Sequence, residues 1–448
     1  MIAQSQTSQV KPAQSQLKAS EKANFKHLVG DIAWFGLAMA ATSRFLSVYA
    51  IRLGATPVDL GWISGLPALI MLVSASFGAW WTHRYGNPVR SLFLPGLGMR
   101  FMFLLPAFAP FFPPHLQPLW LIVSVSLPAL PQGVAAVAFF VVIRGSIDPS
   151  HMTHLLSRRQ LAVNICVAVA ALTFGLWLKG VPFPVNYQVM FLVAFAFSLG
   201  SLYHCIRLRV EDRKRATAEM ASVISKPVVS KPTAMRRATK SFAQTLVKPW
   251  RSAAFRRVGF LTALIHIVFF FLVPVVPLFL VNRLGADEGY MAVFALVELA
   301  AGATASILAP RVTARIGTRP MIALAMVGTA LSAAIIALAP NLFVALFAAV
   351  FSGGCWTAAA GVGIFTYFVD NTPAEEMSVY STAFHQVIGL SVFVGPMLGS
   401  LLANGGANLI MLMMFGAAIR LFAAPLVESS LFARWRARVQ GEPVPHAL

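Results

Sequence analysis

Twelve long apolar runs, separated by polar gaps, dominate this sequence and limit most strongly the folds that it can adopt. Each run has about 20 residues, the length that an α-helix needs to cross the hydrocarbon core of a bilayer. A spanning segment must satisfy its own backbone hydrogen bonds, so we expect helices rather than strands. The runs cover approximately 30–51, 58–81, 89–112, 117–143, 160–179, 187–207, 257–281, 288–310, 320–340, 342–368, 379–403 and 407–427. The sequence therefore predicts an all-α polytopic membrane protein.

The charge distribution supports this prediction and suggests an orientation. Only 11% of the 448 residues are charged, and the net charge is +20. In a soluble protein such a charge would indicate nucleic acid binding, but here the cations collect in the polar gaps, so we expect no nucleic acid partner. Twelve spans place both termini on one side, and that side holds 29 of the 35 Lys and Arg residues, against 3 on the other. The positive-inside rule then predicts cytoplasmic termini, with the chain in the lipid bilayer of the plasma (cell inner) membrane.

The longest and most basic gap divides the chain into two groups of six spans. The predicted organisation is a disordered cytoplasmic tail (1–29), a six-helix bundle (30–207), a basic cytoplasmic linker (208–256), a second six-helix bundle (257–427) and a cytoplasmic tail (428–448). Within the linker, Met235, Ala238, Phe242 and Leu246 follow helical spacing among Lys and Arg. This stretch is either an amphipathic helix on the anionic inner leaflet or a flexible solvated linker.

The two groups of spans are related by an internal duplication. "RLGA" occurs at 52–55 and again at 283–286, an offset of 231 residues. "RYGN" at 84–87 finds "RIGT" at 315–318 with the same offset. Later landmarks keep the order at offsets of 222 and 226: Asp148 with Asp370, and Gln160 with Gln386. Parallel repeats of six spans are typical of transporters.

The duplication also shows where the two halves differ. In each "RLGA" copy the glycine is expected to end a helix, and the arginine to lie at the lipid interface. The polar residues inside the membrane have no polar counterpart in the other half: Arg44 aligns with Val275, and Glu298 aligns with Pro67. We therefore expect a substrate site to lie among these asymmetric residues.

Two loops carry a family motif. The loop after span two, "AWWTHRYGNP" (79–88), and its repeat "PRVTARIGTR" (310–319) each contain Arg-x-Gly. These residues are Arg84, Gly86, Arg315 and Gly317. With six plus six spans, inward termini and a long basic central loop, the chain resembles the major facilitator superfamily over about 30–427. The family motif has Asp before this Arg, but here His83 and Ala314 occupy that position, which weakens the expectation of the family's cytoplasmic latch.

The resemblance implies a fold and a layout of the spans. It implies a secondary transporter in which spans 1, 4, 7 and 10 line a cavity, spans 2, 5, 8 and 11 shape the interface between halves, and the others lie outside. Span four of many proton-coupled members carries Arg-x-x-Gln-Gly. Here Gln132 and Gly133 match, but Ala129 replaces the Arg, so the usual coupling arginine is missing.

Charges deep in the membrane are costly and are therefore candidates for function. Four residues qualify: Arg44, Arg100, Glu298 and Arg420. The family layout places Arg44 and His266 at the cavity, Glu298, His385 and Gln386 at the interface or cavity wall, and Arg100 and Arg420 at the periphery in structural roles. Glu298 is the one acid in the middle of a span. It is either a proton carrier or half of a permanent ion pair that locks one conformation, for which Arg44 is one candidate partner.

Other polar and kinking residues complete the candidate site. Gln132, Asn164 and Trp356 are candidates for polar or stacking contacts with a substrate. Pro274 and Pro277 should bend span seven, either as a moving hinge or as a static kink. The sequence has no P-loop, HExxH or GxSxG motif and no Cys/His spacing typical of a metal site. We therefore expect no enzymatic activity, no cofactor and no metal.

These observations predict a secondary active transporter that moves a small solute by alternating access. Protons are the candidate coupling ion. Three deep arginines against one glutamate favour an anionic or amphipathic substrate, and efflux is one direction of transport to consider. Two alternatives stay open: a lipid flippase or scramblase on the same fold, and a non-transporting membrane scaffold or sensor.

Overall fold

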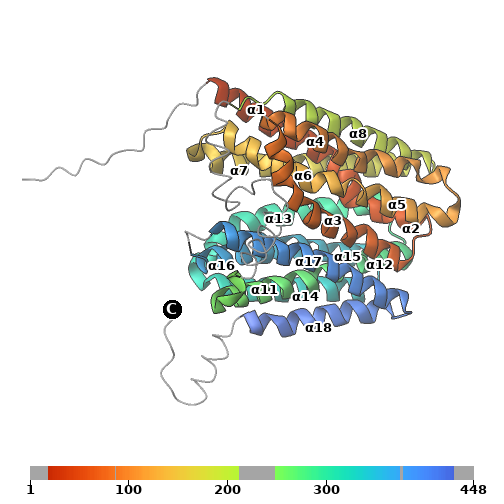
Figure 1. Cartoon of the computed structure of the whole chain (residues 1–448). Helices are drawn as coiled ribbons and strands as arrows, with labels where there is room; N and C mark the ends of the chain where they lie inside the picture. The colour runs from red at the N-terminus through yellow and green to blue at the C-terminus, as the bar shows by residue number, and fades with distance from the viewer. Residues whose placement is uncertain (1–18, 86, 211–247, 374–376, 428–448) are drawn as a thin grey trace, which may run out of the picture.

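The computed structural model describes residues 19–85, 87–210, 248–373 and 377–427 (Figure 1). These residues form helices and no strand, and twelve of the segments are long and apolar enough to cross a membrane. The all-α prediction is therefore confirmed. Gly86, the second tail, most of the first tail, most of the linker and its predicted amphipathic helix lie outside the described residues.

The first half contains six spans. The first span consists of α1 (Ala19–Ala40), the π-helical turn η1 (Ala41–Phe45) and α2 (Leu46–Arg52). The second is α3 (Pro57–Arg84), and the third is α4 (Pro88–Leu104) with η2 (Leu105–Phe111). The fourth consists of η3 (Pro114–Leu116), α5 (Gln117–Ser126) and α6 (Ala129–Ser146). The fifth and sixth are α7 (Pro149–Gly180) and α8 (Val185–Ile206).

The second half repeats this plan below the first in Figure 1. The seventh span consists of α11 (Ala253–Phe270) and α12 (Val275–Asn282). The eighth and ninth are α13 (Glu288–Ile316) and α14 (Thr318–Leu338). The tenth consists of α15 (Leu342–Trp356), the π-helical turn η4 (Thr357–Gly363) and α16 (Ile364–Asp370). The last two are α17 (Met377–Asn404) and α18 (Leu409–Val427).

The first helix begins earlier than the sequence suggested. A tail was expected up to residue 29, but α1 starts at Ala19. Polar contacts hold this extension: Asn24 donates to the carbonyl of Ser146 at 3.0 Å, and Glu21 accepts from the ring of His151 at 3.0 Å. Hydropathy predicts only the apolar part of a helix that crosses the bilayer. The polar turns of α1 before that part are stabilised by side-chain hydrogen bonds to distant residues, which hydropathy does not detect.

Both "RLGA" glycines end helices, as predicted. Gly54 has φ of 80° and Gly285 has φ of 70°, a left-handed conformation that costs glycine little. At the first copy, the amides of Gly54 and Ala55 donate to the carbonyls of Ile51 and Ala50, at 3.0 and 2.9 Å. These bonds satisfy carbonyls that the helix end would otherwise leave free.

The first, fourth, seventh and tenth spans are irregular in mid-length. The first and tenth contain the π-helical turns η1 and η4, and the fourth is interrupted between α5 and α6. The seventh breaks between Phe270 and Val275, and Pro274 caps the second piece. Proline has no N–H to donate, which favours a break at this point. Pro277 follows within α12. Irregular backbone at membrane depth is tolerated where protein or a cavity surrounds it.

The two halves share a hydrophobic core at one end of the bundle. There, α3 packs against α17 and α7 against α13. The core of the first half includes Leu278, Ala292 and Ala295 from the second half. We call this end, where α2 ends and α13 begins, the closed end.

At the opposite end, the described residues form separate cores in the two halves. This termini end is where α1 begins and α18 ends. Its core in the first half contains Leu28, Val142 and Leu155. Its core in the second half contains Phe255 and Phe368. The halves are therefore joined at the closed end and packed independently at the termini end.

Candidate functional site

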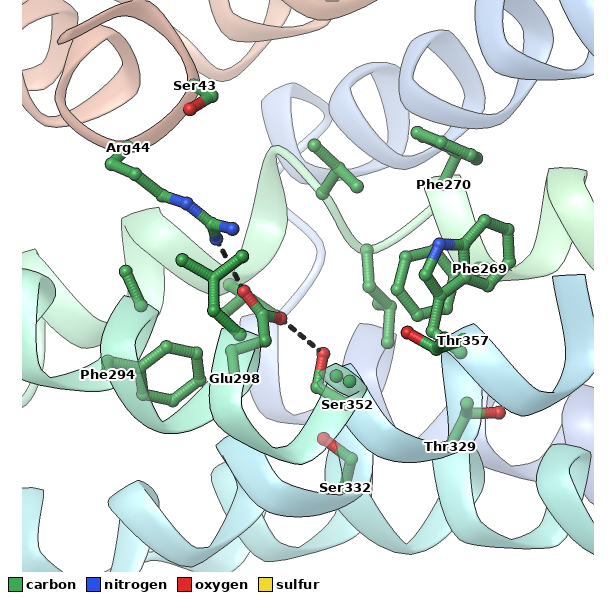
Figure 2. Close-up of a pocket in the computed structure, with 18 of the residues that line it drawn as sticks. Ser43, Arg44, Phe269, Phe270, Phe294, Glu298, Thr329, Ser332, Ser352 and Thr357 are labelled. Carbon is green, nitrogen blue, oxygen red and sulfur yellow. Dashed lines mark hydrogen bonds and ion pairs between the residues drawn. The ribbon is translucent and has the colours of Figure 1, made fainter. Parts of the chain in front are cut away.

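A cavity of 710 Å³ lies where the two halves meet, and most of the residues that line it belong to the second half (Figure 2). The second half supplies residues from α11, α12, α13, α14, α15, η4 and α18. The first half supplies Ser43, Arg44, Ser47, Val48, Gln160 and Asn164. The cavity is therefore asymmetric, which fits the asymmetry of the polar residues in the repeat.

An ion pair crosses the cavity from one half to the other. The Nη1 nitrogen of Arg44, in the turn η1, lies 2.6 Å from Oε2 of Glu298 on α13 (Figure 2). Oε1 of Glu298 accepts a hydrogen bond from Ser352 at 2.7 Å. Both charged side chains are 22% exposed. Both carboxylate oxygens are thus occupied by protein groups, while cavity contents can still reach the pair.

Close helix packing fixes the position of Glu298. A Cβ atom added to Gly353 on α15 would lie 2.0 Å from the carbonyl oxygen of Glu298. That distance is far below van der Waals contact, so α13 and α15 approach this closely because residue 353 is glycine. The neighbouring Ser352 is thereby brought against the carboxylate.

Aromatic side chains form another part of the wall. Trp356, the last residue of α15, stacks on Phe269 with 3.8 Å between ring centroids. The ring of Phe270 meets Trp356 edge-on at 5.5 Å. His266 lies 5.2 Å from Trp356 but is buried outside the cavity lining, and its Nδ1 donates to the carbonyl of Thr262. The structure therefore places Trp356 at the cavity and His266 beside Trp356.

Arg420 lies at the cavity wall instead of the periphery. It is buried, and it donates to the carbonyls of Thr329 at 2.8 Å, Val268 at 3.1 Å and Phe269 at 3.2 Å. At the break in the seventh span, the amide of Leu272 donates to the carbonyl of Phe269. In a continuous helix it would donate to Val268, whose carbonyl is here left to accept from the guanidinium of Arg420. Helix order along the chain could not show that a long side chain on α18 reaches this break.

A second ion pair joins the halves at the closed end. Arg52 contacts Glu288 through Nε at 2.5 Å and through Nη2 at 2.9 Å. The hydroxyl of Tyr187 donates to the same carboxylate at 2.9 Å. Lys179 and Asp287 form a longer, exposed pair nearby, at 3.4 Å. Depth in the membrane does not reveal this group, because Glu288 begins its span and Arg52 stands out in the sequence only as part of "RLGA".

The remaining candidates separate into those near the cavity and those outside it. Asn164 lines the cavity and accepts a hydrogen bond from Gln160 at 3.0 Å. His385 is exposed on α17 and donates to the carbonyl of Ser381 at 2.8 Å. Gln386 and Gln132 also lie outside the cavity lining. Of the predicted site, the structure brings together Arg44, Glu298, Asn164 and Trp356.

The Arg-x-Gly loops lie at helix ends away from the cavity. Arg84 ends α3, with its guanidinium 5.9 Å from the centre of the Trp80 ring. Arg315 is exposed in the last turn of α13, and Gly317 follows with φ of 92°. This glycine separates α13 from α14 in a conformation that other residues rarely adopt. Gly86 is outside the described residues.

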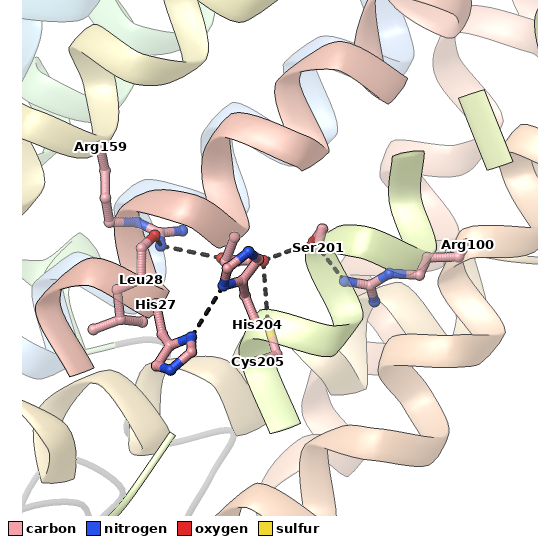
Figure 3. A network of polar contacts seen from close by, with 8 residues as sticks. His27, Leu28, Arg100, Arg159, Ser201, His204 and Cys205 are labelled. Atoms are coloured by element: carbon pink, nitrogen blue, oxygen red, sulfur yellow. Dashed lines mark hydrogen bonds and ion pairs between the residues drawn. The ribbon is translucent and has the colours of Figure 1, made fainter. Parts of the chain in front are cut away.

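A polar network ties the first half together near the termini end (Figure 3). Asp31 contacts Arg159 at 3.1 Å and accepts from Ser201 at 2.7 Å. Arg100 donates to the same Ser201 hydroxyl at 2.7 Å and to the carbonyl of Ser198 at 2.6 Å. The network connects α1, α4, α7 and α8, and its residues do not line the cavity.

A family model for the major facilitator superfamily matches residues 32–303 and 258–444. The chain belongs to the major facilitator superfamily. It is thus a multi-pass membrane protein of a family of non-enzymatic transporters, with twelve candidate membrane helices among the described residues.

Solved structures with this fold are distant in sequence. A mutant of the nucleoside transporter NupG superposes with a TM-score of 0.69 at 8% identity, covering 90% of this chain and 99% of NupG. The inward-open xylose transporter XylE from E. coli has a TM-score of 0.63 at 13% identity, covering 91% and 95%. An inward-facing bacterial homolog of the lysosomal transporter Spinster has a TM-score of 0.61 at 14% identity, covering 92% and 95%. A search of curated proteins finds no match.

Proposed function

We propose that the chain is a secondary active transporter that moves a small solute across the plasma membrane by alternating access. The observation that carries this proposal is the Arg44–Glu298 pair, which spans the two halves at the wall of their shared cavity. The halves share a core at the closed end and have separate cores at the termini end. This arrangement is the one expected of a cavity that opens toward the termini.

The distribution of Lys and Arg supports a cytoplasmic location for the termini. The cavity would then load from the cytoplasm, which is compatible with efflux. The likeness to inward-open and inward-facing transporters supports the same state. A shared cavity also favours transport over a scaffold or sensor role.

We further propose that Glu298 couples transport to protons. A proton on Glu298 removes its charge and thereby the attraction to Arg44. Two unit charges about 4 Å apart attract by about 4 kcal/mol at an effective dielectric constant of about 20. Loss of that attraction would remove one of the two ion pairs that hold the first span against α13 and so favour separation of the halves. A solved structure with this fold is named a D-xylose-proton symporter, which supports the proposal of proton coupling.

Spin-label distances test alternating access without a known substrate. After replacement of Cys166, Cys205 and Cys355, labels are placed at Leu156 and Phe365 for the termini end. A second pair is placed at Val185 and Phe343 for the closed end; all four side chains are exposed. In nanodiscs, acidification should shorten distances at one end and lengthen them at the other.

The Glu298→Gln variant should show the low-pH distances at neutral pH, because its amide imitates the protonated carboxyl. Asp287→Asn, which keeps an N-capping oxygen, serves as the matched control and should behave like the wild type. If acidification leaves the distances in the wild type unchanged, proton-driven alternating access is wrong. Translocation of labelled lipids with unchanged distances would instead identify a scramblase.

A further inference from the structure

Arg420 is a buried cation at the cavity wall that has no acidic partner in the described part of the chain. Its three hydrogen bonds go to backbone carbonyls, which satisfy N–H groups but carry no net negative charge. Its Nε is buried and has no hydrogen-bond partner among the described residues. A buried charge without a counter-charge is costly, so the site favours a ligand that brings one.

The first half shows how this chain treats a buried arginine with a structural role. Arg100 also bonds backbone carbonyls, but it reaches the carboxylate of Asp31 through the hydroxyl of Ser201 (Figure 3). Arg100 lies outside the cavity lining, whereas Arg420 is part of it. The two arginines therefore differ in whether they reach a carboxylate of the protein and in whether they line the cavity, and both properties matter for binding an anion.

The carboxylate of Glu298 does not compensate Arg420. One of its oxygens is taken by Arg44 and the other by Ser352. With Arg44 and Glu298 balancing each other, Arg420 leaves the cavity with a net positive charge. An anionic solute is attracted by that charge, and a cationic one is repelled.

The neighbouring aromatic residues indicate the rest of the ligand. The guanidinium of Arg420 lies 5.4 Å from the centre of the Phe269 ring, and Phe269 stacks on Trp356. Trp356 lines the cavity, and its indole N–H has no acceptor in the structure as described. By contrast, the indoles of Trp81, Trp120 and Trp177 each donate to a backbone carbonyl. Trp356 thus offers both a ring surface and a free donor beside the cation.

We propose that the cavity binds an amphipathic organic anion with an aromatic ring. Its acidic group faces Arg420 and the indole N–H of Trp356, and its ring packs on the Phe269–Phe270–Trp356 wall. This inference names the substrate class of the proposed transporter and so rests on the proposed function.

Three matched probes test the ligand class by calorimetry on the purified full chain. The probes are 2-naphthoate, its neutral amide 2-naphthamide, and the saturated decahydro-2-naphthoate, each with a reference titration into empty micelles. A charge-assisted hydrogen bond is worth about tenfold in affinity or more. We expect 2-naphthoate to bind at least about tenfold more tightly than the neutral amide, which lacks the charge. We expect it to bind about threefold more tightly than the saturated acid, which keeps the charge and lacks only the aromatic ring.

Variants of the cavity residues test whether Arg420 and Trp356 cause the preference for the anionic, aromatic probe. Arg420→Gln should bring the naphthoate-to-naphthamide affinity ratio close to one, whereas the matched control Arg100→Gln should leave it unchanged. Trp356→Leu should weaken both aromatic probes and reduce the preference over the saturated acid. If Arg420→Gln does not fold, Arg420→Lys keeps the charge and should keep the preference for the anion.

Equal binding of naphthoate and naphthamide by the wild type, or no binding of either, would overturn the proposal. So would an equal loss of the ratio in the Arg100 and Arg420 variants. The spin-label distances respond to pH independently of these probes. If the distances change with pH while the probes fail to discriminate, the substrate class is wrong and the transporter proposal stands.

Discussion

Two ion pairs join the first span to α13, and they differ in their surroundings. At the closed end, Glu288 is 6% exposed and holds two nitrogens of Arg52 and the hydroxyl of Tyr187. In the cavity, Glu298 is 22% exposed and meets one nitrogen of Arg44. The same pair of residue types thus occurs once with a buried carboxylate and once with a carboxylate that faces the cavity.

This difference teaches what each pair can do. A desolvated carboxylate with several donors is costly to separate from them, because the carboxylate is left unpaired and buried. A carboxylate at a cavity can exchange its partner for a proton, water or a solute. We expect the closed-end pair to hold the halves together and the cavity pair to respond to the cavity contents.

The largest effect should follow from reversing one charge of the cavity pair. Arg44→Glu places two carboxylates against each other, and their repulsion at about 4 Å is worth about 4 kcal/mol at an effective dielectric constant of about 20. The free energy of unfolding, measured by SDS titration in mixed micelles, should fall by about that amount. The double variant Arg44→Glu/Glu298→Arg should recover most of it.

Arg283→Glu is the control for charge reversal, because Arg283 is exposed and occupies the "RLGA" position of the second half. It should change stability little. If the double variant at Arg44 and Glu298 is no more stable than Arg44→Glu alone, the direct pairing of these side chains is contradicted.

A smaller effect should follow from neutralising the closed-end acid. Glu288→Gln removes the charge that binds Arg52 and Tyr187, and hydrogen bonds to charged groups contribute about 2 kcal/mol. The same SDS titration should show a loss of about 2 kcal/mol, and the Val185–Phe343 label distance should lengthen. Asp287→Asn removes only an exposed pair and should cost less than about 0.5 kcal/mol. Equal losses in both variants would remove the distinction between the buried and the exposed pair.

The smallest effect should come from one hydroxyl group. Tyr187→Phe deletes the hydrogen bond to Glu288 while keeping the ring stacked on Tyr49, at 4.4 Å between centroids. We expect a loss of about 1.5 kcal/mol. The hydroxyl of Tyr290 is buried without a partner among the described residues, so Tyr290→Phe should leave stability unchanged or raise it. A loss at Tyr290 as large as that at Tyr187 would contradict this account.

The fold could be predicted from the sequence because a bilayer requires each span to have a similar length and to satisfy its backbone hydrogen bonds as a helix. The "RLGA" glycines likewise ended helices as predicted, because their role depends on local backbone geometry alone. Helix ends were harder to place, since α1 continues to Ala19 through polar contacts with distant residues such as Ser146.

The candidate site could be predicted only in part. Depth in the membrane marked Arg44 and Glu298, whose juxtaposition the repeat alignment could not show. Depth alone does not tell which way a side chain points, so Arg420 was expected at the periphery and His266 at the cavity. Serines and phenylalanines such as Ser352 and Phe269 carry no signal in an apolar span until the helices are packed together.

The packing of Gly353 against the backbone of Glu298 has a consequence for engineering this protein. The backbone of Glu298, from which the carboxylate extends, is held in place by the close approach of two helices. A mutagenesis library that aims at new specificity should therefore keep residue 353 constant and vary the facing residues of the first span, Ser43, Arg44 and Ser47. Variation of these residues changes the groups that face the carboxylate of Glu298 and leaves the position of Glu298 unchanged.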